Sequence, residues 1–173
     1  MDVTEAIMNR RSIRTFKKLE LPPKIINQLI DAARWAPSAG NMQPWTFIVA
    51  AKAETKQMLS TAAYEQKSLT EASIVIVVCA NLKHATETYG PRGQTLYCYQ
   101  DTAAAIENIL LTACSLGLGT CWIGAFNEEQ IKKVINCPPE MRPVALIPVG
   151  YPNESPSPRA RRPAVEVMHQ ESF

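Results

Sequence analysis

The spacing of apolar and polar positions predicts several amphipathic helices. Val3, Ala6 and Ile7 share one face of a first helix, which Asp2 and Glu5 begin as a capping box. Pro22-Pro23 begins a second helix, which ends at Ala36 because the residue before Pro37 is disfavoured in helical conformation. Further helices are predicted over residues 53–63, from an N-cap at Asp101 to Leu116, and after Asn127.

Runs of β-branched and aromatic residues predict strands. These lie at residues 45–50, 73–80, 120–125, 143–149 and, in the tail, 163–167. The run at 73–80 is apolar throughout, as in a strand buried on both faces. Residues 82–99 lack a clear period and contain Gly90-Pro91, which predicts an irregular lid or binding loop. The order of elements predicts one α/β or α+β domain over residues 1–173, with helices on both faces of a four- or five-stranded sheet.

Two features predict contact with a second subunit. The helix ending at Leu116 is apolar on nearly every side, and so small a domain cannot easily surround it alone. Gly117 suits the C-cap of this helix. Residues 152–173 form an extended, Pro-rich tail that is expected to cross a surface.

Composition narrows the class of protein. A hydrophobic fraction of 46% supports a true core, and a net charge of +2 argues against a nucleic-acid partner. The five cysteines are scattered without a Cys-x-x-Cys pair, which predicts reduced thiols in the cytoplasm and neither disulfides nor a metal site. We expect neither a signal peptide nor a membrane span.

The positive charge is concentrated in two distant segments. Arg10, Arg11, Ser12 and Arg14 follow the first helix, and residues 159–162 supply three more arginines. Between them, residues 36–45 form a turn-rich loop of small and amide side chains. Cations that converge from distant positions commonly hold a phosphate, so the pattern predicts a phosphorylated aromatic cofactor. Solvated basic turns remain the alternative.

The common catalytic signatures are missing. The chain has no Gly-x-Gly-x-x-Gly, no Walker loop, no Gly-x-Ser-x-Gly and no evident pair of catalytic carboxylates. A binding pattern without an acid, base or nucleophile indicates that a cofactor performs the chemistry.

Four segments together carry a family resemblance. They are Arg10-Arg11-Ser12-Ile13-Arg14, residues 36–45, residues 117–126, and Gly150-Tyr151-Pro152 followed by the arginines. In this order they resemble the short form of the FMN-dependent nitroreductase family. The resemblance implies an α+β fold and an intertwined homodimer that exchanges its C-terminal strands, with two FMN molecules at the subunit interface.

The resemblance also implies roles for individual residues. Six residues match the family positions that bind the phosphate, the ribityl chain and the flavin edge: Arg10, Arg11, Ser12, Arg14, Arg159 and Arg161. Four residues match the family loop that approaches the flavin from the partner subunit: Pro37, Ser38, Ala39 and Asn41. Gln66 matches an amide that contacts the ring, and the backbone of Ile123, Gly124 and Ala125 matches the stretch beside the reactive nitrogen. Some larger members have a glutamate in place of Gly124, so only backbone contacts are expected here.

The implied activity is ping-pong transfer of reducing equivalents from NADH or NADPH through FMN to a nitroaromatic or quinone. Two alternatives stay open at this point. One is a different FMN chemistry on the same fold, such as reductive dehalogenation or flavin consumption. The other is a non-catalytic module that binds phosphate or nucleic acid through the arginines.

Overall fold

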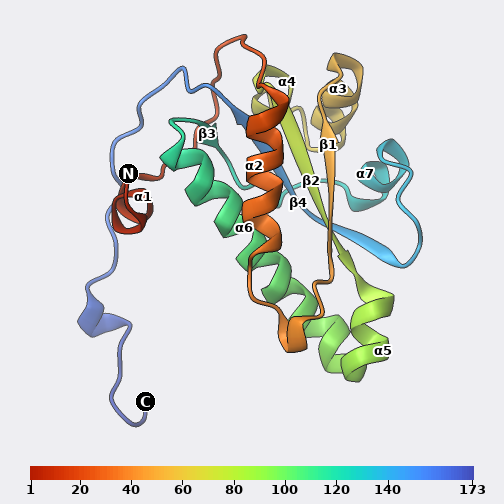
Figure 1. The fold of residues 1–173 in the computed structure, drawn as a ribbon, viewed down its shortest axis with the longest axis vertical. Helices are drawn as coiled ribbons and strands as arrows, with labels where there is room; N and C mark the ends of the chain where they lie inside the picture. Colours follow the sequence, from red (N-terminus) through yellow and green to blue (C-terminus); the bar gives the residue numbers. More distant parts are fainter.

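The structure, a computed structural model, describes all 173 residues (Figure 1). The α-helices are α1 (Val3–Asn9), α2 (Pro23–Arg34), α3 (Ala53–Ala62), α4 (Ser68–Glu71), α5 (Leu82–Arg92), α6 (Cys98–Ser115) and α7 (Glu128–Val134). Short helical turns η1 (Ala39–Asn41) and η3 (Ala164–Glu166) are 3-10, and η2 (Gly93–Tyr97) is a π-helix. The strands are β1 (Trp45–Ala50), β2 (Ile74–Asn81), β3 (Gly119–Thr120) and β4 (Met141–Gly150).

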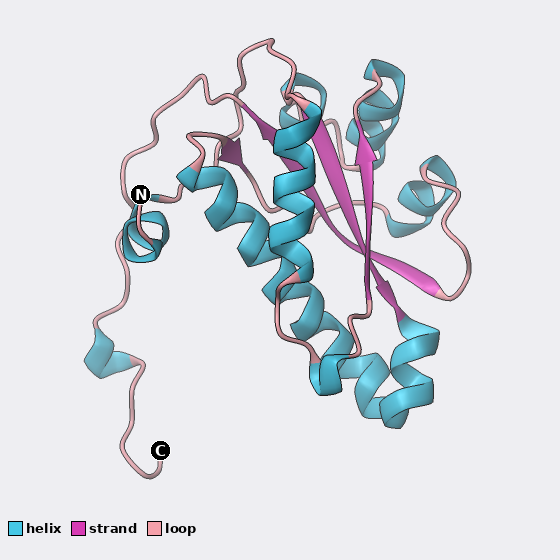
Figure 2. Ribbon diagram, in the orientation of Figure 1, coloured by secondary structure: helices cyan, strands magenta, loops and turns pink.

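The four strands form one sheet in the order β1-β2-β4-β3, and every neighbouring pair is antiparallel (Figure 2). Ile76 in β2 lies opposite Val49 in β1 and Ile147 in β4, and a register shift follows at Val78/Cys79. The prediction of a mixed fold built on a four- or five-stranded sheet is confirmed.

The hydrophobic core lies on both faces of this sheet. On one face Ile74, Ile76 and Val78 pack against α2 and α6. On the other face Val75, Val77 and Cys79 pack against α3 and α7. Alternate residues of a strand point to opposite faces, so β2 is apolar throughout because both of its faces are covered.

Local signals fix most helix ends as predicted. The Asp2 carboxylate accepts from the Glu5 N–H at 2.8 Å, and Glu5 returns the contact to the Asp2 N–H at 3.0 Å. Asn127 caps α7 by accepting from the Gln130 N–H at 3.0 Å. Gly117 follows α6 with φ of 73°, a left-handed conformation that favours glycine.

The prediction of an irregular segment over residues 82–99 is wrong, because this stretch is almost entirely helical. The Asn81 side chain caps α5 by accepting from the His84 N–H at 2.9 Å. Gly90 bends the chain at φ 60° and ψ −151°, and Pro91 begins a new turn that continues through η2 into α6. The predicted N-cap role of Asp101 is also wrong, since α6 begins at Cys98.

Two strand predictions also need correction. The predicted strand at 120–125 is shortened to β3 and a single bridge between Ile123 and Leu146. The predicted strand at 163–167 is absent: Ala164–Glu166 form the 3-10 turn η3, and the tail runs away from the sheet with its side chains exposed (Figure 1). Within one chain the tail forms a single antiparallel bridge, between Pro152 and Phe16, and no strand, so strand exchange in a dimer stays a prediction.

The outer side of α6 is only partly covered. Ala103, Ala104 and Leu111 keep partial exposure, while Ile106 and Ile109 are buried against the sheet. Coverage by a second subunit therefore also stays a prediction. None of the helices combines the length and hydropathy that crossing a membrane requires.

Candidate functional site

The segment that carries Arg10 to Arg14 is held in extended form against the edge of the sheet. The Ile13 N–H donates to the Thr120 carbonyl at 2.8 Å, and Ser12 forms a parallel bridge with Thr120. Further along, the Lys17 N–H donates to the Tyr151 carbonyl at 2.9 Å. These bonds lay the N-terminal segment beside the chain that leaves β4, and so bring the two ends of the sequence together.

The two basic clusters meet in one cavity of about 260 Å³, which we call the basic cavity. Its lining residues are Arg10, Arg11, Ser12, Arg14, Pro156, Ser157, Arg159 and Arg161. The predicted convergence of distant cations is thus present in a single chain. Arg162 does not line the basic cavity, because its guanidinium turns to the Glu166 carboxylate at 3.2 Å.

Little negative charge opposes these arginines. Arg10 lies 3.7 Å from the Glu107 carboxylate, a loose pair. Glu154 is committed to the main chain, since its carboxylate accepts from the N–H groups of Arg14 and Thr15. The side chain of Arg14 forms no hydrogen bond within the chain, so its donors are free for an anion.

Cys121 lies beneath this segment and is almost fully buried. Burial raises the pKa of its thiol, although the nearby charge of Arg14 and a hydrogen bond with Ser12 work in the opposite direction. The thiol therefore stays protonated near neutral pH, which fits a packing role better than a nucleophilic one.

The loop over residues 36–45 is tightly folded. Its backbone takes positive φ at Gly40, Asn41 and Gln43. The Ser38 hydroxyl accepts from the Gln43 N–H at 2.9 Å, and the Asp101 carboxylate accepts from the Ala39 N–H at 3.1 Å. Gly40 is pressed against the Tyr89 hydroxyl, which would lie 1.9 Å from a Cβ at this position.

A single chain does not bring this loop to the basic cavity. Ala39 is bonded to Asp101 in the first turn of α6, whereas Arg10 reaches α6 at Glu107 and shares a second cavity with Cys114. At about 1.5 Å per residue, Glu107 and Cys114 lie roughly 9 and 20 Å along the helix from Asp101. Pro37, Ser38, Ala39 and Asn41 therefore lie apart from the arginines in one subunit.

Gln66 and the segment Ile123–Ala125, the remaining candidate residues, lie together. The Gln66 side chain donates to the carbonyls of Ala63 and Ala125, each at 2.9 Å. Ile123 is buried and exchanges two main-chain hydrogen bonds of 3.0 Å with Leu146. Gly124, between Ile123 and Ala125 in the chain, is exposed, and a Cβ built at this position would meet no atom within 4 Å. The main chain at Gly124 is thus open to a flat ligand.

Comparison with known proteins decides the family. The model of the nitroreductase family matches residues 7–67 and 57–151. The chain belongs to the nitroreductase family. A nitroreductase family protein from Clostridium novyi NT has a solved structure that is 36% identical, with a TM-score of 0.80, over 92% of this chain and 89% of that one.

Other nitroreductase-like relatives extend over nearly the whole chain. One named NADH dehydrogenase, from Thermus thermophilus, is 29% identical over 97% of this chain and 95% of its own. Another, named FMN reductase (NADPH), from Bacillus subtilis, is 28% identical over 98% of this chain and 73% of its own.

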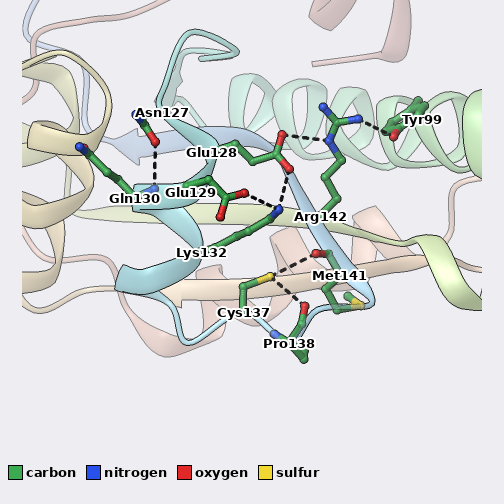
Figure 3. Close-up of polar contacts among 10 residues, drawn as sticks. All are labelled: Tyr99, Asn127, Glu128, Glu129, Gln130, Lys132, Cys137, Pro138, Met141 and Arg142. Atoms are coloured by element: carbon green, nitrogen blue, oxygen red, sulfur yellow. Dashed lines mark hydrogen bonds and ion pairs between the residues drawn. The ribbon is translucent and has the colours of Figure 1, made fainter.

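One polar cluster of this chain was missed in the sequence. Arg142 in β4 donates to the Tyr99 hydroxyl at 2.7 Å and to the Glu128 carboxylate at 3.0 Å (Figure 3). Lys132 also contacts Glu128, at 3.0 Å. Burial opposes ionisation of Glu128, but hydrogen bonds from Lys132 and Arg142 outweigh it and lower the pKa of this carboxyl. Only the Glu128–Lys132 pair has a local spacing; Tyr99, Glu128 and Arg142 are too far apart in sequence for spacing to have indicated the cluster.

Proposed function

We propose that this nitroreductase is an FMN-dependent oxidoreductase that passes reducing equivalents from NADH or NADPH to a small electrophile, a nitroaromatic or a quinone. The observation that carries the proposal is the basic cavity. Five arginines and two serines line it, with Pro156 as the one apolar side chain, which suits a phosphomonoester of about two negative charges.

The chain's own residues fit FMN in three places. Arg10, Arg11, Arg14, Arg159 and Arg161 would bind the phosphate, with Ser12 donating to the ribityl chain. The open backbone at Gly124 leaves room for the isoalloxazine ring. Gln66 holds the Ala125 carbonyl through its Nε2, which leaves its Oε1 free to accept from the ring.

FMN supplies two-electron redox chemistry when it is bound, so the protein need not provide an acid or a base. The main chain of Ile123, Gly124 and Ala125 would hold the ring edge at a fixed position. We further propose that the site is completed in a homodimer, where Pro37, Ser38, Ala39 and Asn41 come from the second subunit. The separation of this loop from the basic cavity within one chain supports that arrangement.

The direct test is an absorbance spectrum of the purified protein, followed by anaerobic addition of NADH and of NADPH. Flavin bands that bleach with either nucleotide would support the proposal. Flavin bands that persist with both would favour a different FMN chemistry, such as reductive dehalogenation or flavin consumption. A protein that neither carries flavin nor takes it up on incubation with FMN would refute the proposal.

A further inference from the structure

Another cavity, of about 410 Å³, borders Gly124 and is separate from both cavities lined by Arg10. Its lining comes from the start of α6, the segment after β3, α7 and β4: Tyr99, Gly124, Phe126, Glu128, Arg142, Pro143 and Val144. Its volume lies within the range of about 300–1,000 Å³ that is usual for small-molecule sites. We call it the Tyr99 cavity.

The walls of the Tyr99 cavity suit a flat, largely apolar ligand. Tyr99, Phe126, Pro143 and Val144 present aromatic and aliphatic surface. The Arg142 guanidinium lies 5.5 Å from the centroid of the Tyr99 ring and stacks over it. Gly124 adds no side chain, so the cavity is continuous with the open backbone to which we assign the flavin ring.

Two hydrogen-bond donors are left free in this cavity. The Tyr99 hydroxyl accepts from Arg142 Nη1 at 2.7 Å, and its own hydrogen has no acceptor within the chain. Arg142 uses Nε for Glu128 and Nη1 for Tyr99, which leaves Nη2 without a partner. A hydroxyl that accepts from a cation becomes a stronger donor, because hydrogen bonds in a chain polarise one another.

The two charges that line the cavity balance, so the cavity offers no net attraction to an anion. The Glu128 carboxylate lies 3.0 Å from Arg142 and lines the cavity, and on its other side it is held by Lys132 at 3.0 Å. A carboxylated or phosphorylated ligand would meet this negative group. A neutral aromatic ring with a carbonyl or nitro oxygen meets only the donors and the apolar walls.

We propose that the Tyr99 cavity is the subsite for the electron acceptor, and that Tyr99 and Arg142 bind a carbonyl or nitro oxygen of a neutral aromatic electrophile. This inference rests on the proposed flavin-dependent function. Reduction of a quinone to its hydroquinone adds two electrons, from the NAD(P)H-reduced cofactor, and two protons from water, so that each C=O becomes C–O–H. The oxygen gains negative charge during this change, and donors aimed at it stabilise the transition state.

The test uses the flavin-loaded protein, a neutral naphthoquinone and ferricyanide, an acceptor with no carbonyl or nitro oxygen. Tyr99→Phe and Arg142→Gln are compared with wild type. We expect each to lower kcat/KM for the quinone by roughly 10- to 100-fold, the size of effect typical for one lost transition-state donor. Turnover with ferricyanide and bleaching by NADH are expected to stay within about twofold of wild type.

Tyr97→Phe is a matched control. The Tyr97 hydroxyl accepts from Arg92 at 2.9 Å under a similar cation–ring contact of 5.4 Å, but neither residue lines the Tyr99 cavity. Tyr97→Phe therefore removes the same kind of tyrosine–arginine hydrogen bond outside the cavity, and we expect it to leave quinone turnover unchanged.

A binding measurement gives a readout that does not depend on turnover. Without a nicotinamide, calorimetric titration of the oxidised protein with the quinone should show weaker binding for Tyr99→Phe than for Tyr97→Phe. Equal quinone affinity and equal kcat/KM in Tyr99→Phe and wild type would overturn the subsite. Equal losses with quinone and ferricyanide would also overturn it. If NADH and NADPH both fail to bleach wild-type flavin, the proposed function itself fails, and the calorimetric comparison still judges the cavity.

Discussion

Arg14 and Arg162 provide a sharp test of the basic cavity, because they look alike in sequence and differ in the structure. Arg14 lines the cavity and has no partner for its guanidinium. Arg162 lies outside the cavity and is paired with Glu166 at 3.2 Å. If the cavity holds the FMN phosphate, Arg14→Ala should weaken FMN binding and Arg162→Ala should not.

The expected magnitude follows from the loss of one charge-assisted hydrogen bond, worth about 1.5–3 kcal/mol. At about 1.4 kcal/mol per tenfold change, Arg14→Ala should raise the FMN dissociation constant roughly 10- to 150-fold. Arg14→Lys should recover part of this loss, since it restores the charge without the planar fork of donors. Arg162→Ala should change the constant less than about threefold.

Fluorescence titration of FMN with the apo-protein measures these constants, at low salt and again at about 0.5 M salt. Screening should weaken wild-type binding more than binding to Arg14→Ala, because the variant has one cation fewer in the cavity. Equal losses for Arg14→Ala and Arg162→Ala would show that only overall charge matters. Unchanged affinity in Arg14→Ala would remove this residue from the site.

Three further predictions concern stability and assembly. Gly119→Ala should lower the free energy of unfolding by about 1–3 kcal/mol in a denaturant titration, because its Cβ would lie 2.8 Å from Ile13 Cβ; a wild-type midpoint would mean that the segment of Arg10 is not packed as described. Burial raises the pKa of Asp101, so the folded state holds this proton more tightly than the unfolded state. Below the usual pKa of aspartate the carboxyl is protonated in both states and does not lower the free energy of unfolding. As pH rises from that value through the higher folded-state pKa, ionisation of the buried carboxyl progressively lowers the free energy of unfolding. Asp101→Asn should accordingly gain stability relative to wild type as pH is raised from about 3 to 8, and parallel melting-temperature profiles would contradict this. We also expect no stable folded monomer, so sedimentation and circular dichroism on dilution should show dissociation and loss of structure together, and a folded monomer would refute it.

Sequence patterns predicted the elements whose signals are local or strongly periodic. The capping box at Asp2, the cap at Asn127 and the doubly buried strand β2 all depend on neighbouring residues or on a long apolar run. The segment 82–99 was missed because Gly90-Pro91 normally breaks a helix. Here the glycine makes the bend and the proline begins the next turn, so the helical path continues around them.

In the candidate site, too, some features were predicted from the sequence and others were not. The distant arginines were predicted to converge, and both clusters do line one cavity. Arg162 was not separated from its neighbours, although Glu166 four residues later is at the spacing of a local ion pair and forms one in the structure. The pattern also gave no hint that Tyr99 and Arg142 lie together, because no local rule relates a residue at the start of α6 to one in β4.

The pairing of Arg14 with Glu154 has a consequence for how the protein is made. The two residues are 140 positions apart, and the arginines of the basic cavity come from both sides of this contact. On the ribosome, the sheet and most of the core residues emerge before Glu154 and the second group of arginines. The basic cavity can therefore be completed only near the end of synthesis, and so can the binding of FMN that we propose for it. A chain that stops before residue 153 would lack Arg159 and Arg161, and we expect it to retain less FMN than the full chain.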